Sequence, residues 1–180
     1  MVKVLVGVLV LLLAFSTAGQ SPPPPGQPSA AAALGTPPAT DVTAADLQTF
    51  IMQLPRDVIS DRPIRVVDVG GYRVGVFGVF RPKSVKQDAV LHEVKTTEIY
   101  YMLDGAGTLV TGGTLVDERR ESSTATTVRG SRIEGGVSRR VTKGDVVIIP
   151  GRVPHWWSTL EGDISYLIFR PDPENRLQLR

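Results

Sequence analysis

The chain has 180 residues, no cysteine and a formal net charge of +2, with 20 basic and 18 acidic residues interspersed along it. The lack of cysteine excludes disulfides, thiolate metal ligands and a cysteine nucleophile, and the scattered basic residues form no stripe of the kind that binds nucleic acid. This length and composition fit one domain that is stabilised by its core alone, or by its core and a metal ion.

Residues 1–18 have the pattern of a secretory signal peptide. Lys3 supplies a positive charge, an apolar run extends from Val4 to Phe15, and small residues follow up to Ala18. The run is shorter than the roughly 20 apolar residues that span a bilayer. We therefore predict cleavage near Ala18 and a secreted or periplasmic protein without membrane contact after cleavage, with a retained membrane anchor as the alternative.

Residues 19–42 are predicted to be a disordered linker. Residues 19–40 consist mainly of proline, alanine and glycine and contain no charged side chain. Such a segment cannot bury enough apolar surface to offset the entropy that ordering would cost.

The predicted domain covers residues 43–180 and begins with one short helix. Thr43 is its expected N-cap, and Asp46 suits the first turn. Pro55 is expected to end the helix. Between them, apolar residues fall on one helical face, which must pack against something apolar: Leu47, Phe50, Ile51 and Leu54.

After Pro63 the sequence becomes typical of short β-strands separated by turns. We predict about seven or eight strands with turns every 8–12 residues, which is the pattern of a sandwich or barrel. The strands are expected within residues 64–69, 72–80, 98–103, 107–111, 137–158 (two strands) and 163–170. Residues 117–136 are polar and are predicted to form a long excursion with an irregular hairpin.

The chain has only two histidines, and both lie in regularly spaced sequence patterns. His92 is followed by Glu98 and then by Gly105, in the stretch "HEVKTTEIYYMLDG". His155 ends the stretch "GDVVIIPGRVPH", which begins at Gly144. These spacings resemble the two conserved motifs of the cupin superfamily, G-x5-H-x-H-x3/4-E-x6-G and G-x5-P-x-G-x2-H-x3-N. The resemblance covers residues 65–170.

The resemblance implies an all-β fold, a cupin-type double-stranded β-helix (jelly-roll) barrel, here with one short N-terminal helix. The chain departs from the cupin pattern at three positions. Val94 stands where the second histidine is expected, unless His92 is itself the second histidine and the first is missing. Arg152 stands in place of a glycine, and Thr159 in place of an asparagine.

The candidate metal ligands are His92, Glu98 and His155. Side chains two apart on a strand share a face, so Glu98 and Tyr100 are both expected to face the barrel interior. Closure of the barrel can bring His155 opposite them. Two imidazoles and a carboxylate suit a divalent metal ion such as Fe, Mn, Ni or Zn, and they leave positions open for water, substrate or dioxygen. The alternative is a cupin that has lost its metal.

Four residues are candidates for the lining of a ligand pocket: Tyr100, Met102, Arg152 and Trp157. Core packing is the alternative interpretation for Met102. Arg152 suits either bidentate binding of a carboxylate or phosphate, or a solvated turn. Trp156 and Trp157 are expected on opposite faces of a strand.

These features predict an exported single-domain cupin that binds one divalent metal ion and acts on, or binds, a small organic molecule. As an enzyme it would be a metal-dependent oxygenase or isomerase, although no residue is singled out as catalytic. A metal-free module that binds a sugar or aromatic acid is the alternative, and a surface-tethered structural domain is a third hypothesis. Cupins often pair, so we also expect a homodimer.

Overall fold

The computed structural model describes residues 39–180. The predicted signal peptide and most of the predicted linker therefore lie outside the described residues. In the described part of the chain, no helix is both long enough and apolar enough to cross a membrane.

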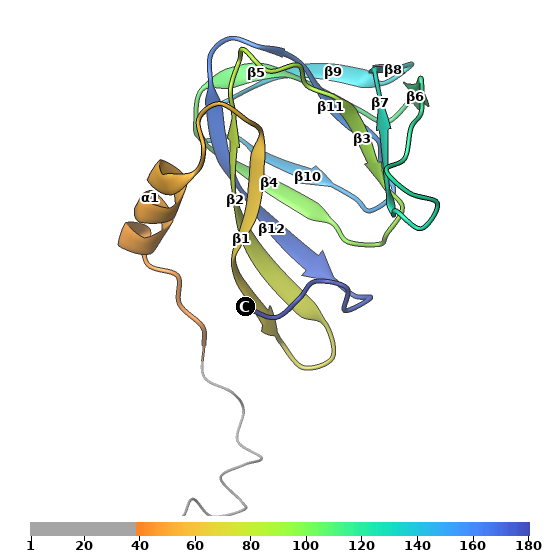
Figure 1. The fold of residues 1–180 in the computed structure, drawn as a ribbon. Helices are drawn as coiled ribbons and strands as arrows, with labels where there is room; N and C mark the ends of the chain where they lie inside the picture. The colour runs from red at the N-terminus through yellow and green to blue at the C-terminus, as the bar shows by residue number, and fades with distance from the viewer. Residues whose placement is uncertain (1–38) are drawn as a thin grey trace, which may run out of the picture. The chain divides into compact units, whose positions relative to one another are not determined.

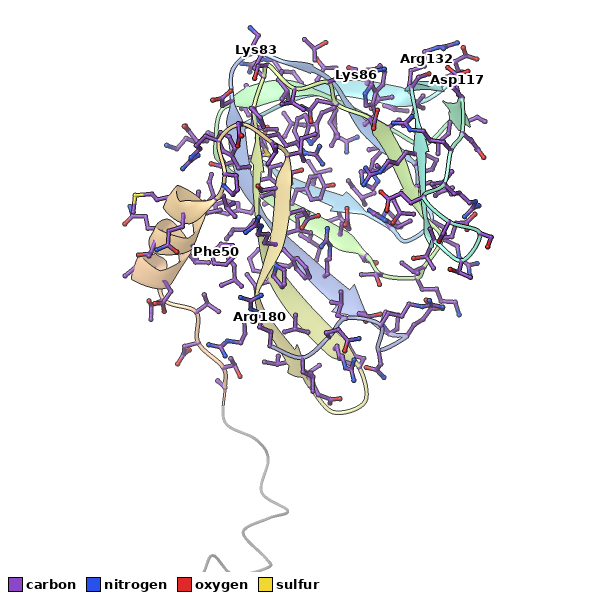
Figure 2. The ribbon with its side chains drawn as sticks, viewed as in Figure 1. Phe50, Lys83, Lys86, Asp117, Arg132 and Arg180 are labelled. Carbon is purple, nitrogen blue, oxygen red and sulfur yellow. The ribbon has the colours of Figure 1, made fainter. Side chains whose placement is uncertain are left out.

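Helix α1 (Ala44–Gln53) begins and ends as the sequence predicts. The Thr43 hydroxyl accepts a hydrogen bond from the backbone N–H of Asp46 at 3.2 Å, and the Asp46 carboxylate accepts the backbone N–H of Thr43 at 3.3 Å. This reciprocal capping box satisfies two N–H groups that the helix itself leaves free. Phe50 lies on the side of α1 that faces the strands (Figure 2). A methyl group added to Gly78 would come within 2.9 Å of the Phe50 ring, so the glycine lets the helix pack closely.

The strands form two five-stranded antiparallel sheets and one two-stranded ribbon (Figure 1). The first sheet has the order β1 (Ser60–Asp68), β2 (Arg73–Arg81), β12 (Ile164–Asp172), β4 (Glu98–Asp104), β10 (Val146–Ile149). The second has the order β7 (Thr127–Gly130), β3 (Ala89–His92), β11 (His155–Leu160), β5 (Ala106–Thr111), β9 (Val137–Thr142). The ribbon pairs β6 (Thr114–Val116) with β8 (Arg132–Glu134).

Gly105 marks the corner at which the chain passes from the first sheet to the second. Strand β4 ends at Asp104 and β5 begins at Ala106. Gly105 has a φ of 81°, and a Cβ there would lie 2.4 Å from the carbonyl oxygen of Asp163. Only glycine fits this corner without strain. Two facing antiparallel sheets linked in this way confirm the predicted all-β jelly-roll fold.

The main core lies between the two sheets and contains the inward-facing residues of both. Burial along β4 alternates from Glu98 through Tyr100 to Met102, as expected for a strand with one face against the core. The buried members of the cluster are Val66, Phe77, Val79, Tyr100, Met102, Leu109, Val141, Val147, Ile149, Trp157, Leu160, Ile164, Tyr166 and Ile168.

Several strands differ from the prediction in number or extent. The described residues contain twelve strands, and the four-residue β3 was not expected. Strand β1 begins before Pro63, which is tolerated because β1 is an edge strand and its register shifts between Pro63 and Arg65. Residues 137–158 hold three strands, not two. Strands β7 and β8 do not form a hairpin with each other, because β7 pairs with β3 and β8 with β6.

Candidate metal centre

The three predicted ligands converge between the sheets. His92 is the last residue of β3, His155 the first of β11 and Glu98 the first of β4. Strands β3 and β11 are neighbours in the second sheet, where His155 pairs with Val90, whereas β4 belongs to the first sheet. One ligand atom from each of the three side chains lies within 4.8 Å of the others.

Both imidazoles present Nε2 to the Glu98 carboxylate. Nδ1 of His155 lies 3.1 Å from the carbonyl oxygen of Val153, which can only accept, so Nδ1 carries the proton. Nε2 of His155 is then left 3.3 Å from Oε2 of Glu98. In His92, Nδ1 lies 3.0 Å from the Thr127 hydroxyl and Nε2 lies 3.8 Å from Oε1 of Glu98. Partners on Nδ1 that orient the ring are typical of histidines that bind metals through Nε2.

Burial keeps both imidazoles in the neutral form that ligates metals. It lowers the pKa of His92 to about 4, even though the charge of Glu98 acts in the opposite direction. Burial also lowers the pKa of His155, against the opposing effects of Glu98 and the Val153 carbonyl. Neutral imidazole has a free lone pair to offer, so both rings are suited to coordinate a cation at neutral pH.

Glu98 is a buried carboxylate held by Arg170 and Tyr100. Nε of Arg170 donates to Oε1 at 2.8 Å, and the Tyr100 hydroxyl donates to Oε2 at 3.0 Å. Burial alone would raise the pKa of Glu98, but the charge of Arg170, together with the neighbouring His155 and His92 and the hydrogen bond from Tyr100, outweighs burial and lowers the pKa to about 2. Glu98 is therefore an ionised oxygen donor facing two nitrogen donors.

Arg170 was not among the predicted site residues. Its guanidinium lies between two carboxylates, with Nη2 2.7 Å from Oε1 of Glu98 and 2.6 Å from Oδ2 of Asp61. It also stacks on the Phe77 ring, with Cζ 4.2 Å from the ring centre. The sequence feature that could have identified Arg170 is the alternation of strand faces. Arg170 lies two residues after Ile168 on β12, so the two side chains share a face, and Ile168 is buried.

The ligand cluster opens into a cavity of about 450 Å³. The cavity combines apolar walls with several charged groups, and its lining is Ile59, Asp61, Arg81, Asp88, Val90, His92, Glu98, Tyr100, Thr127, Arg129, His155 and Arg170. A second hollow of about 300 Å³ shares His92, Glu98 and Arg170 with the first, and Val94 lines it. The residue that replaces the expected histidine therefore lies beside the same cluster.

Of the four predicted pocket residues, the structure places only Tyr100 in the lining of the main cavity. Met102 and Trp157 are 1% and 3% exposed and pack in the core, because their strand positions direct them between the sheets away from the ligand end. Arg152 is exposed on the turn before β11 and lines a separate hollow with Leu91 and Glu93. Its φ of 65° is left-handed, which explains why the motif has glycine there.

No family model and no curated protein matches the sequence. Solved structures resemble the chain only in general fold. The DMSP lyase DddQ from Ruegeria pomeroyi is 18% identical, with a TM-score of 0.49 over 77% of this chain and 68% of that one. A double-stranded β-helix protein from Klebsiella pneumoniae is 12% identical, with a TM-score of 0.46 over 78% of this chain and 97% of that one. An RmlC-like cupin from Methanocaldococcus jannaschii is 13% identical, with a TM-score of 0.41 over 68% of this chain and 90% of that one.

Proposed function

We propose that this cupin-type domain binds one divalent metal ion through His92, Glu98 and His155. The observation that carries the proposal is the contact between His155 and Glu98. Because Nδ1 of His155 is protonated, its neutral ring directs the Nε2 lone pair at a carboxylate oxygen 3.3 Å away. Two acceptors repel each other at this distance unless a proton or a metal ion lies between them. Burial disfavours the protonated ring, so a metal ion is the better solution.

The spacing between Glu98 and each imidazole also suits a metal ion. Ligand atoms about 2.1 Å from one ion and about 90–110° apart lie about 3.0–3.4 Å from each other. The contact of 3.3 Å between His155 and Glu98 falls in this range, and the contact of 3.8 Å between His92 and Glu98 is slightly longer. Two imidazoles and one carboxylate favour Fe, Mn, Ni or Zn over Mg or Ca.

A metal bound by only three protein ligands supplies a Lewis acid with positions open to another molecule. We infer that the domain acts on, or binds, a small organic molecule in the adjoining cavity of about 450 Å³. Arg170 and Tyr100 would hold the Glu98 carboxylate in place, and the two sheets would keep bulk water from the cluster. Oxygenase or isomerase chemistry is compatible with this arrangement.

One observation favours a metal-free binding module as the second candidate. Arg170 and Tyr100 already satisfy Oε1 and Oε2 of Glu98 by hydrogen bonds. In this alternative His155 would be a buried imidazolium paired with Glu98, and the cavity would bind its ligand directly.

Export to the periplasm or the cell exterior remains part of the proposal, on the strength of residues 1–18 alone. Mass spectrometry of the protein from an exporting host tests it. A mature N-terminus at Gly19 supports export with cleavage, and an intact Met1 contradicts the predicted cleavage.

Elemental analysis of purified protein distinguishes the two candidates. After incubation with each metal salt and removal of excess, the wild type should hold about one ion per chain, and His155→Ala should hold far less. Thr159→Ala is the matched control, because Thr159 is an exposed residue of the same strand. Sub-stoichiometric metal in wild type and control alike would support the metal-free module.

A further inference from the structure

Arg81 is a half-buried cation in the cavity wall without a direct acidic partner. It ends β2 and lines the same cavity as the ligand cluster. Within residues 39–180, no carboxylate oxygen lies within 4.0 Å of its guanidinium. The other two arginines of the lining differ in this respect, because Arg129 pairs with Glu121 at 3.6 Å and Arg170 pairs with Glu98.

Neutral groups fix the position of the Arg81 side chain. Its Nε donates to the Tyr166 hydroxyl at 2.8 Å, and its Nη1 donates to the Gln87 side-chain oxygen at 2.9 Å. Gln87 is in turn held through its amide by the carbonyl oxygens of Pro82 and Val85, at 3.2 and 2.6 Å. Tyr166 is completely buried. These contacts orient the guanidinium in advance and use only two of its five N–H donors.

The free N–H groups of Arg81 suit a planar anion. One N–H of Nη1 and both of Nη2 remain after the two hydrogen bonds are counted. This edge of a guanidinium matches the two oxygens of a carboxylate in a bidentate pair. A phosphate is a poorer match, because such sites gather several donors, often at a helix N-terminus. The single helix of the described residues contributes nothing to the cavity lining.

The charge of the cavity also favours an anion. Two of its charged groups are neutralised by side chains outside the lining, Asp88 by Arg119 and Arg129 by Glu121. These two pairs therefore add no net charge to the cavity.

The remaining charges balance only in the absence of a metal. Asp61 and Glu98 are negative, whereas Arg170 and Arg81 are positive. Histidine binds a metal as neutral imidazole, so a divalent cation would add two positive charges to this balance. An anionic ligand would relieve this excess.

We propose that Arg81 binds the carboxylate of a small carboxylic acid whose opposite end faces His92, Glu98 and His155. This inference rests on the proposed function, since it assigns the substrate class of the same cavity. Ile59 and Val90 supply apolar contacts for the body of the acid, and Tyr100 lies beside the ligand cluster. Arg81 thereby selects an acid over a neutral molecule of the same shape.

The test compares small acids with their primary amides, which have the same shape and no charge. Propionate, 3-hydroxypropionate and benzoate are paired with their amides, and dissociation constants are measured by ligand-observed NMR on zinc-treated and on metal-free protein. We expect at least one acid to bind about tenfold or more tightly than its amide, as a charged hydrogen-bonded pair predicts. Arg81→Gln should remove this preference, and Arg81→Lys should retain only part of it, because lysine lacks the bidentate fork.

Arg129→Gln is the matched control, because Arg129 lines the same cavity but already pairs with Glu121. It should leave the preference within about twofold of wild type. Equal affinity for every acid and its amide, failure of every acid to bind, or a full preference in Arg81→Gln would overturn the proposal. If Arg81→Gln does not fold, the comparison of Arg81→Lys with Arg129→Gln decides instead.

Zinc content, measured in every sample, separates this proposal from the metal proposal. Zinc-treated wild-type protein that holds no zinc would contradict a zinc-binding centre, yet the acid preference and its dependence on Arg81 would still be measurable. Normal zinc content together with an unchanged preference in Arg81→Gln would contradict only the role of Arg81.

Discussion

Arg170 and Glu98 form a buried ion pair at the centre of the candidate site. Nε of Arg170 donates to Oε1 of Glu98 at 2.8 Å, and Nη2 lies 2.7 Å from the same oxygen. The side chains are only 12% and 6% exposed. The ion pair keeps Glu98 ionised and directed at the two imidazoles before any ligand arrives. In the proposed metal centre, such pre-positioning would compensate in part for the absence of a further histidine.

Replacing Arg170 with methionine should destabilise the protein by about 3 kcal/mol, because it leaves the Glu98 carboxylate buried without its cation. Urea denaturation in the presence of a chelator measures this loss. The double variant Arg170→Met with Glu98→Gln should recover part of it, with a coupling energy of about 1–3 kcal/mol. Additive effects of the two substitutions would show that the pair does not act as a unit.

Metal ions should raise the melting temperature of the wild type. A metal at about 100 times its dissociation constant stabilises the folded state by about 2.7 kcal/mol, which corresponds to a shift of roughly 5–15 °C. Differential scanning fluorimetry with Fe, Mn, Ni and Zn salts measures the shift, with MgCl₂ as the ionic control.

The rise in melting temperature on addition of metal should nearly vanish in His92→Ala and in His155→Ala, because each variant removes one of the three proposed donors. Thr159→Ala should respond like the wild type. Equal shifts in all four proteins would indicate that the metals bind elsewhere on the surface.

A histidine at position 94 should tighten metal binding. Val94 is half-buried and lines a hollow together with His92 and Glu98, so an imidazole there would lie beside the existing donors. Competition with a chromogenic zinc chelator compares Val94→His with Val94→Leu, which adds volume without a ligand atom. Equal zinc affinity in the two variants would show that position 94 does not reach the ion.

Arg152→Gly should stabilise the protein by about 0.5–1 kcal/mol. The substitution removes the strain of a side chain in the left-handed region. The greater entropy of glycine in the unfolded chain offsets part of this gain in stability. The φ of Arg152 is 65°, whereas Arg65 is an exposed strand residue without a positive φ. Arg65→Gly should therefore lose stability in the same denaturation assay. A loss at both positions would contradict the inferred strain.

Local patterns were sufficient to predict the elements whose structure depends on neighbouring residues. Thr43 and Asp46 form a reciprocal cap three residues apart, and the alternation from Glu98 to Tyr100 fixes which face of β4 points inward. The spacing of the two motifs predicted that His92, His155 and Glu98 form one site, although strand pairing is what brings their donor atoms together.

Residues whose role depends on distant contacts could not be predicted. Arg170 reaches Asp61 across 109 positions of the sequence, and this contact exists only because β12 and β1 lie on either side of β2. In the sequence, Arg81 cannot be distinguished from any other arginine at the end of a strand. Only the fold shows that it lies in a cavity wall. Strand β3 was missed because a run of four residues is too short to show a period.

The central claim is tested most directly by a crystal structure of the metal-treated protein, with anomalous diffraction recorded at the absorption edge of the metal. We predict one anomalous peak between the sheets, about 2.0–2.3 Å from Nε2 of His92, Nε2 of His155 and a carboxylate oxygen of Glu98. An empty cluster in protein treated with each of Fe, Mn, Ni and Zn, with His155 still paired directly to Glu98, would contradict it.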